Sequence, residues 1–498
     1  MTTLLEKVDN TRIEANQLLN SKKRSELGQF MTPMSVAKYM ASLFREKHLK
    51  AHYILDAGAG VGSLTCAYLE RLINNNLAQS ANVVAFEIDS ILRGHLTNSI
   101  QMFSEKLNLS SQIMSDDFIE WAVQTLLDNK TLLDQNNQLR VTHAILNPPY
   151  KQIASDSRHR KLLRSVGIET GNLYSAFIAL SLALMEEGGQ IVAIIPRSFC
   201  NGPYFRRFRQ YLLEKAAIHH LHLFESRDKA FKDNEVLQEN VIIMLERGGI
   251  QGDVTVSTST DGSFNDYVTK TRPFERIVSS TDTEKFIHIP TSSVENPIVE
   301  SDKIIYSLQD IGVQVSTGPV VDFRTRGSLR AMPEENTVPL FYPNHFVGQY
   351  TEWPKEMKNP NAIIRDDTTE KSMYPNGYYT VVKRFSSKEE KKRVVAGVLD
   401  PEKFDTDVVA FENSLNVLHS NKQGIPRELA YGLFVYLNST LVDQYFRIFN
   451  GHTQVNATDL RTMKFPSKQV LMELGSWTLT NSGKIEQEQI DKKVEEIL

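Results

Sequence analysis

The segment Asn147-Pro148-Pro149-Tyr150 has the residue types of a rigid binding site for a planar amine. It directly follows the apolar stretch 141–146, so it stands where a predicted buried strand ends. Two consecutive prolines remove two backbone donors and leave a stiff turn whose carbonyl groups face outward. The Asn147 side-chain oxygen and the Pro148 carbonyl can accept both N–H bonds of an exocyclic amine such as adenine N6, while Tyr150 offers a flat face. We predict that this segment activates such an amine.

A glycine-rich turn earlier in the chain predicts a nucleoside site. In ILDAGAGVGSLT, Asp56, Gly58 and Gly60 stand where a predicted strand gives way to a helix. Glycines there allow tight backbone geometry and close approach of a ligand. The next predicted strand ends at Glu87, whose carboxylate can accept both hydroxyls of a ribose. Ser63 stands three residues after Gly60, where a dinucleotide motif has glycine, so the pattern fits an adenosine ligand without phosphates.

A further pair of acids follows another predicted strand. Asp116 and Asp117 precede Phe118. An acid at this point can accept from an adenine amine while the phenyl ring packs on the base. Either aspartate could instead cap the helix expected to begin at Phe118. Both roles stay open, and of the two acids we favour Asp117 because it adjoins Phe118.

These motifs need a scaffold, and the sequence predicts a doubly wound, mostly parallel α/β sheet. Apolar strand candidates alternate with helical stretches from residue 53: YILDAG, NVVAFEID, VTHAILNPP, GGQIVAIIP, AIHHLHLF and ENVIIMLE. Helices are predicted over GSLTCAYLERLINN and over NLYSAFIALSLALMEEGG, the second ending at Gly188-Gly189. The alternation fades near residue 250. We therefore predict a chemical domain over residues 1–250 and a mixed α+β domain over residues 251–498.

Composition narrows the class of protein without naming a partner. With 498 residues and a net charge of -4, any surface for nucleic acid must be local. The chain shows no apolar run long enough to cross a bilayer and no apolar signal core, so we expect a cytoplasmic protein with no membrane partner. Cys66 and Cys200 are expected to be free core thiols, and no metal site is predicted.

The motifs DAGAGVG, FEID, DDF and NPPY, in this order, resemble those of S-adenosylmethionine-dependent amino methyltransferases. ELGQFMTP upstream is similar to the N-terminal motif of γ-class DNA adenine-N6 methyltransferases, and the catalytic half is TaqI-like. Over nearly the whole chain, including IPRSFCNGPYFRRFR and GHTQVNATDLR, the sequence resembles the PstI/BsuBI-type modification methylases of type II restriction systems. The resemblance implies a Rossmann-like S-adenosylmethionine-binding domain followed by a DNA target-recognition domain.

The resemblance also implies roles for individual residues. The cofactor-binding set would be Phe30, Thr32, Pro33, Asp56, Gly58, Gly60, Glu87, Ile88, Asp117, Phe118 and Asn147. Within it, Thr32 and Pro33 would hold the methionine part of the cofactor, and Glu87 its ribose. The catalytic set would be Asn147, Pro148, Pro149 and Tyr150. Phe231 would form a second wall, opposite Tyr150, around a target adenine rotated out of the duplex.

The resemblance implies double-stranded DNA as the partner. It also implies that the protein acts as a monomer, and that a cognate restriction endonuclease forms no stable complex with this protein. The basic residues expected near phosphates are Arg158, Arg160, Lys161, Arg164, Arg324, Arg326, Lys383 and Arg384. The loop NGHTQVN is expected to read base edges. By resemblance the site would be a short palindrome such as CTGCAG.

Other planar amines remain alternatives for the same motif. A glutamine amide in a protein or a guanine in structured RNA could occupy an NPPY clamp, and so could cytosine N4, although Ser-Pro-Pro-Tyr is more usual there. Cytosine-C5 chemistry is excluded because it needs a thiolate nucleophile, and neither cysteine follows a proline. The acidic pair Glu389-Glu390 lies in a charged run typical of a solvated face, so a fused nuclease is disfavoured.

Overall fold

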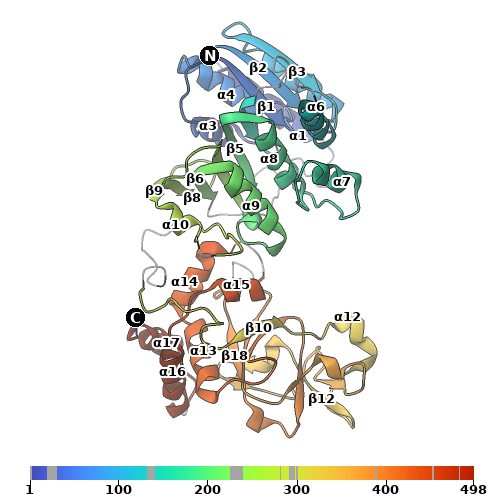
Figure 1. The fold of residues 1–498 in the computed structure, drawn as a ribbon, viewed down its shortest axis with the longest axis vertical. Coiled ribbons are helices and arrows are strands. Elements are labelled where there is room, and N and C mark those ends of the chain that lie inside the picture. The colour runs from blue at the N-terminus through green and yellow to red at the C-terminus, as the bar shows by residue number, and fades with distance from the viewer. Residues whose placement is uncertain are drawn as a thin grey trace. The chain divides into compact units, whose positions relative to one another are not determined.

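A nine-stranded sheet forms the centre of the first half of the chain in a computed structural model (Figure 1), which describes residues 3–18, 31–131, 141–224, 239–280, 282–290, 298, 301–386, 390–450, 454–481 and 483–497. The strand order is β3-β2-β1-β4-β5-β7-β6-β8-β9. The strands are β1 (Leu49–Ala57), β2 (Ala78–Phe86), β3 (Asn108–Met114), β4 (Val141–Leu146), β5 (Met185–Pro196), β6 (Ala216–Phe224), β7 (Asn240–Arg247), β8 (Val254–Ser259) and β9 (Val268–Arg272). Strands β1 to β5 pair in parallel and β7 is antiparallel to both of its neighbours. The predicted doubly wound α/β fold and its six predicted strands are confirmed.

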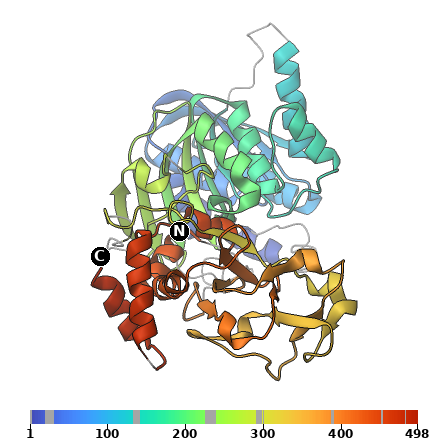
Figure 2. The ribbon, with the colours of Figure 1, turned by 60° about the horizontal axis from the view of Figure 1, so that its bottom comes forward.

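Helices cover both faces of this sheet, as the apolar helical stretches predicted (Figure 1 and Figure 2). They are α1 (Leu4–Leu18), α3 (Met34–Ser42), α4 (Ser63–Asn74), α5 (Ser90–Gln101), α6 (Phe118–Thr131), α7 (Arg158–Ser165), α8 (Leu173–Leu184), α9 (Arg206–Lys215) and the short α10 (Phe274–Ile277). One apolar core lies under α6, α8 and α9, and a second lies under α1, α3, α4 and α5. Among the described residues, no helix has the length and apolarity needed to span a membrane.

The end of α8 differs from the prediction. The helix ends at Leu184, and β5 begins at once with Met185, so Gly188 and Gly189 lie inside the strand. Met185 pairs with Val141 of β4, and this distant partner draws the residues before the glycines into the sheet. A Cβ at Gly189 would come within 2.2 Å of Met185 Cγ, so this glycine serves a close contact and not a helix stop.

The boundary between the two units lies at residues 291 and 292, and the boundary predicted near residue 250 is corrected. Strand β8 pairs in parallel with β6, and β9 pairs antiparallel with β8, so both extend the sheet of the first unit. The stretch VTVSTS lacks the strong apolar character of the earlier strands. This stretch forms a strand because it pairs with β6, and the local sequence does not reveal that pairing.

The second unit is a mixed α+β structure, as predicted. One antiparallel sheet has the order β10-β20-β17-β18 and another sheet has the order β11-β15-β12-β19-β16. Their strands are β10 (Gln314–Thr317), β11 (Leu329–Arg330), β12 (Thr337–Phe341), β15 (Ala362–Ile364), β16 (Met373–Pro375), β17 (Tyr379–Lys383), β18 (Ala396–Leu399), β19 (Val408–Phe411) and β20 (Leu415–His419). The helices include α13 (Arg427–Leu437), α14 (Thr440–Phe449), α15 (Ala457–Thr462), α16 (Lys468–Thr480) and α17 (Gln487–Glu495). Helices α13 and α16 pack so closely that a Cβ at Gly432 would lie 1.7 Å from the carbonyl oxygen of Leu471.

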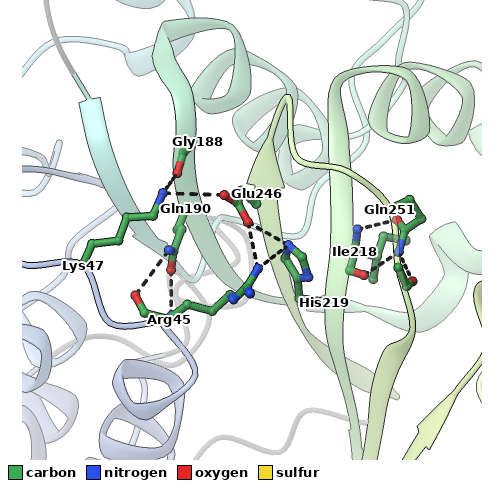
Figure 3. Close-up of polar contacts among 9 residues, drawn as sticks. Arg45, Lys47, Gly188, Gln190, Ile218, His219, Glu246 and Gln251 are labelled. Atoms are coloured by element: carbon green, nitrogen blue, oxygen red, sulfur yellow. Dashed lines mark hydrogen bonds and ion pairs between the residues drawn. The ribbon is translucent and has the colours of Figure 1, made fainter.

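A polar cluster fixes the segment after α3 to strands β5 and β7 of the sheet (Figure 3). The backbone N–H of Arg45 donates to Gln190 Oε1 at 2.8 Å, and Gln190 Nε2 donates to the Arg45 carbonyl at 3.3 Å. Glu246 of β7 accepts from Arg45 Nη1 at 3.1 Å and lies 2.9 Å from His219 Nε2 and 3.6 Å from Lys47 Nζ. These contacts hold the carboxyl end of α3, whose amino end leads into the candidate site.

Candidate active site

A cavity of about 230 Å³ lies at the carboxyl ends of β1, β2 and β4. The carboxyl ends of neighbouring parallel strands meet at one edge of a sheet, and this edge is where α/β folds bind ligands. The structure brings most of the predicted cofactor-binding and catalytic residues to this cavity, whereas Pro33, Asp56, Pro148 and Tyr150, which it also describes, are not part of the lining. Those that line it are Thr32, Gly58, Gly60, Glu87, Ile88, Asp117, Phe118, Asn147 and Pro149, together with Asp116.

The glycine turn after β1 is held against the end of β2. Gly58 and Gly60 adopt φ angles of 88° and 57°, which side chains with a Cβ rarely adopt. The Gly58 N–H donates to the Phe86 carbonyl at 3.0 Å, and the Gly60 N–H donates to Glu87 Oε2 at 3.0 Å. The turn therefore presents its backbone to the cavity, and the Glu87 carboxylate anchors it.

Glu87 is 5% exposed and lies on the cavity wall. Its Oε1 accepts from the Asp89 N–H at 2.8 Å, and its Oε2 accepts from Gly60. Burial raises the pKa of this carboxyl above its ordinary value, while the backbone donors oppose that rise. Each carboxylate oxygen can accept a second hydrogen bond, so the position suits a pair of ligand hydroxyls.

Asp56 occupies a different place from the one predicted. It is fully buried, and among the described residues it is not part of the cavity lining. Its Oδ2 accepts from Thr65 Oγ1 at 2.6 Å. Burial, with a smaller contribution from the charge of Glu87, raises the pKa of Asp56 to about 7. The side chain therefore lies behind the glycine turn, where it supports α4 through Thr65.

Asp117 caps the start of α6, which confirms the alternative role predicted for it, and it also lines the cavity. Its Oδ1 accepts from the backbone N–H groups two and three residues ahead, at 2.9 and 3.1 Å, at the start of α6. Its Oδ2 lies 3.1 Å from His159 Nε2. Asp116 lines the cavity too, so the geometry leaves both acids as candidates. Phe118 is buried, packs against Phe86 with ring centroids 5.2 Å apart, and forms an apolar wall.

Asn147 lies between two hydroxyl groups. Its Nδ2 donates to Thr32 Oγ1 at 3.0 Å, and the Tyr150 hydroxyl donates to Asn147 Oδ1 at 3.1 Å. The same hydroxyl lies 3.2 Å from the carbonyl oxygen of Ile194 on β5. Tyr150 packs edge-on against Tyr174, with ring centroids 6.2 Å apart. The turn that follows β4 is thus fixed by its prolines, by the side chains of Thr32 and Tyr174, and by the backbone carbonyl of Ile194.

Comparison with known proteins decides the family of this chain. The Eco57I restriction-modification methylase family matches residues 32–231. The type II methyltransferase M.BsuBI of Bacillus subtilis is 60% identical over 498 residues, covering 100% of this chain and 99% of that protein. M.PstI of Providencia stuartii is 42% identical over 499 residues, covering 99% of this chain and 96% of that protein. The chain belongs to the type II methyltransferases of restriction-modification systems.

A solved structure, that of the type IIG restriction endonuclease BpuSI, aligns with 95% of this methyltransferase and 63% of that chain. The sequence identity is 14% and the TM-score is 0.48.

The basic segment of the methyltransferase beyond NPPY forms α7, and much of its charge is already paired. Arg158 lies 2.9 Å from Glu120, and Arg160 pairs with Glu169 while remaining largely buried. Lys161 is exposed. Of these residues, Lys161 has the position best suited to a phosphate, whereas Arg160 stabilises the loop after α7.

The other predicted DNA contacts belong to the second unit. Arg324 and Arg326 are exposed on the short helices α12 (Asp322–Thr325) and η4 (Arg326–Ser328). Lys383 pairs with Glu390 at 2.8 Å, and Arg384 donates to a backbone carbonyl at 3.1 Å. Their predicted contacts with DNA stay predictions.

Some predicted site residues lie outside the described part of the chain. They are Phe30, Phe231 and residues 451–453 of the loop NGHTQVN. Of that loop, Asn450 is buried and donates to Asp459 at 2.9 Å, and Asn456 caps α15. Both asparagines are therefore engaged within the second unit.

Sequence reasoning missed several residues of the cavity wall. Lys151 and His159 line it, as do Leu173 and Phe177 of α8. The place of Lys151, directly after the NPPY motif, was a signal that could have identified it. Phe177 lies in a uniformly apolar helix, and its sequence neighbours do not distinguish it from core residues.

Proposed function

We propose that this methyltransferase transfers the methyl group of S-adenosylmethionine to N6 of adenine in double-stranded DNA. The observation that carries the proposal is that Asn147 and Pro149 of the NPPY turn line the same cavity as Glu87. The first is an acceptor site for a planar amine, and the second suits the ribose of a nucleoside. The family supports methyl transfer by a restriction-modification methylase.

The residues of the cavity fit S-adenosylmethionine. Glu87 would accept from the ribose hydroxyls, and Asp117 with Phe118 would hold the adenine, while Asp116 is the alternative acid. Thr32 and Pro33 would hold the methionine part. When bound, this cofactor supplies a methyl group activated by its sulfonium. The glycine turn allows the ligand to approach the backbone, which a Cβ would hinder.

The clamp would activate the target amine by accepting its two protons in hydrogen bonds. Asn147 Oδ1 and the Pro148 carbonyl oxygen would draw the N6 lone pair away from the ring. As the nitrogen gains positive charge on bond formation, the same oxygens stabilise it. Pro148 and Pro149 keep these acceptors from relaxing, so the geometry is set before the substrate arrives.

Catalysis would require the target adenine to leave the helix, because N6 in a duplex is paired and stacked. The Tyr150 ring would form one wall of the base pocket and Phe231 the other. Base stacking on an aromatic ring is worth roughly 1–3 kcal/mol. We expect 2-aminopurine at the target position to brighten in the complex. A target base that stays stacked in the complex would refute the flipping step.

The biological role that follows is protection of host DNA from a cognate restriction endonuclease. We propose that the enzyme acts in the cytoplasm, as a monomer, without a stable complex with that nuclease. Transfer to cytosine N4, to a protein glutamine or to an RNA guanine is the alternative chemistry. The family membership favours DNA over a protein or RNA substrate.

Labelled cofactor and double-stranded DNA would test the proposal. After incubation, nucleoside analysis should place the label in N6-methyladenine, and the Asn147→Ala variant should transfer none. Label in methylcytosine, protein or RNA, with none in N6-methyladenine, would refute it. Sequencing the modified DNA should locate the methylated adenines in one short motif, and adenines scattered without a shared motif would contradict a dedicated recognition domain.

A further inference from the structure

We propose that Thr32 is a positioning residue for the catalytic amide of Asn147. This proposal rests on the function proposed above and extends it, because by resemblance Thr32 was assigned only to the methionine part of the cofactor. In the structure its hydroxyl oxygen accepts from Asn147 Nδ2 at 3.0 Å, across 115 residues of sequence. Thr32 is 3% exposed, and Asn147 is half-buried; both line the cavity.

An asparagine amide can work as an acceptor for the target amine only while its plane is held. Rotation about the terminal side-chain bond costs little, so the side chain alone does not fix where Oδ1 points. In the structure two hydroxyls hold the amide, with Thr32 at the nitrogen and Tyr150 at the oxygen. The Tyr150 hydroxyl donates to Oδ1, and an amide oxygen has two lone pairs, so Oδ1 has the capacity to accept the N6 proton of the target adenine as well.

Thr32 can serve as an anchor because the chain on both sides of it is fixed. The Met34 N–H donates to Asp9 Oδ1 at 3.1 Å, and the same oxygen accepts from Arg12 Nε at 2.7 Å. On the other side, Met31 belongs to a small apolar cluster with Val61 of the glycine turn.

The far end of α3 is fixed too. Gln190 and Glu246 hold Arg45 there (Figure 3). Thr32 therefore stands just before a helix that cannot shift without breaking several contacts. The N-terminal segment in this way contributes directly to the base clamp as well as to the cofactor cavity.

The variant Thr32→Val removes the hydroxyl and nearly keeps the shape. The hydrogen bond from Asn147 Nδ2 to residue 32 is then lost, and the amide is held less firmly. We expect kcat to fall about tenfold or more, because small misplacement of a reacting group is costly. Thr32→Ser, which keeps the hydroxyl, should restore most of the rate.

Two further measurements separate positioning from cofactor binding and from folding. The fall in kcat for Thr32→Val should persist at saturating cofactor, so that any change in cofactor affinity, measured by titration of the DNA-free protein, does not account for it. The matched control is Thr125→Val on α6, which removes a hydroxyl bonded to the Trp121 carbonyl and lies outside the cavity lining. It should keep the parental kcat, and all variants should unfold with the parental cooperativity.

Base discrimination in the absence of cofactor gives a readout independent of turnover. Duplexes that carry adenine or purine at the target position differ only in the N6 amine, so the ratio of their affinities reports the clamp. Thr32→Val should shift this ratio towards purine. In an Asn147→Ala background the same substitution should cause no further shift, because the amide that it positions is gone.

A Thr32→Val variant that is slow at saturating cofactor, with a shifted base ratio and rescue by serine, supports the proposal. Weakened cofactor affinity with a parental rate at saturating cofactor overturns it and leaves Thr32 as a cofactor residue. A Thr32→Ser variant as slow as Thr32→Val also overturns it. If the parent methylates no adenine, the proposed function fails instead, and the parental control alone reveals that.

Discussion

Glu87 provides the sharpest test of the cofactor site. Its two carboxylate oxygens accept from the Gly60 and Asp89 N–H groups, and the side chain is 5% exposed on the cavity wall. The variant Glu87→Ala removes the proposed acceptor for the ribose hydroxyls and leaves the residues of the NPPY turn unchanged. We therefore expect cofactor binding to weaken while DNA binding stays close to the parental value.

The size of the effect follows from the bonds that are lost. Losing the hydrogen bonds between a carboxylate and a hydroxyl pair costs on the order of 1–3 kcal/mol. At 1.4 kcal/mol per tenfold change, this corresponds to a dissociation constant raised by about 5- to 150-fold. Titration calorimetry with S-adenosylmethionine should measure it, and DNA affinity should be determined in parallel.

The control for Glu87→Ala is Asp89→Asn. It also removes one negative charge, and asparagine can still cap α5, where the Asp89 carboxylate accepts from two backbone N–H groups. This variant should bind cofactor like the parent. Coincident cofactor titrations for Glu87→Ala and the parent would remove Glu87 from the site. Equal weakening of cofactor and DNA binding would show that the glycine turn had collapsed.

Three further predictions follow from the described contacts. Asp117→Asn should weaken cofactor binding about tenfold and Asp116→Asn less, because Asp117 adjoins the base-packing ring and asparagine preserves its helix cap. Burial lowers the pKa of His220 to about 4 and that of His222 to about 3, against 6.5 in the unfolded chain. Below pH 6.5 the unfolded chain therefore binds more protons than the folded protein. The free energy of unfolding that these neutral histidines contribute is fully present above pH 6.5 and decreases as the pH falls. In denaturant titrations, His222→Gln should make this decrease shallower by up to about 1.4 kcal/mol per pH unit. Lys161→Ala should reduce the slope of log affinity for DNA against log salt by about one.

Each of these predictions has an outcome that would contradict it. A larger loss of cofactor affinity for Asp116→Asn than for Asp117→Asn would transfer the adenine contact to Asp116. Parallel stability curves for the parent and His222→Gln between pH 6.5 and 4 would show that this histidine titrates normally. An unchanged salt dependence for Lys161→Ala would place that side chain away from the phosphates.

Most of the first unit's sheet could be predicted from sequence because its strands are strongly apolar and sit between turn residues. The stretches before Gly58, before Asp89 and before Asn147 all became parallel strands that end at the cavity. Strands with such a strongly apolar pattern can be recognised from the local sequence, without knowledge of the strands with which they pair. Strands β8 and β9 carry too little apolar character, and the pairing of β8 with β6 and of β9 with β8 moved the domain boundary to residue 291.

The candidate site likewise contains residues that the sequence predicted and contacts that it did not predict. The sequence predicted Glu87, Asp117 and Asn147 as cavity residues, because each one follows a recognisable strand and carries a side chain with evident chemistry. It did not predict that His159 would meet Asp117, or that Asp56 would lie behind the turn with Thr65. Both results depend on how helices pack over the sheet, which neither spacing nor composition encodes locally.

By itself, the sequence determined which segments could be proposed to do chemistry: a predicted acceptor clamp, a predicted nucleoside turn and the order in which they follow one another. These features are local, since a few adjacent residues set the backbone of each turn and the donors and acceptors beside it. Only the tertiary structure decided that Thr32 would hold the amide of Asn147. That contact joins residues 115 positions apart, and it forms because α3 is anchored at both ends to elements that are distant along the chain.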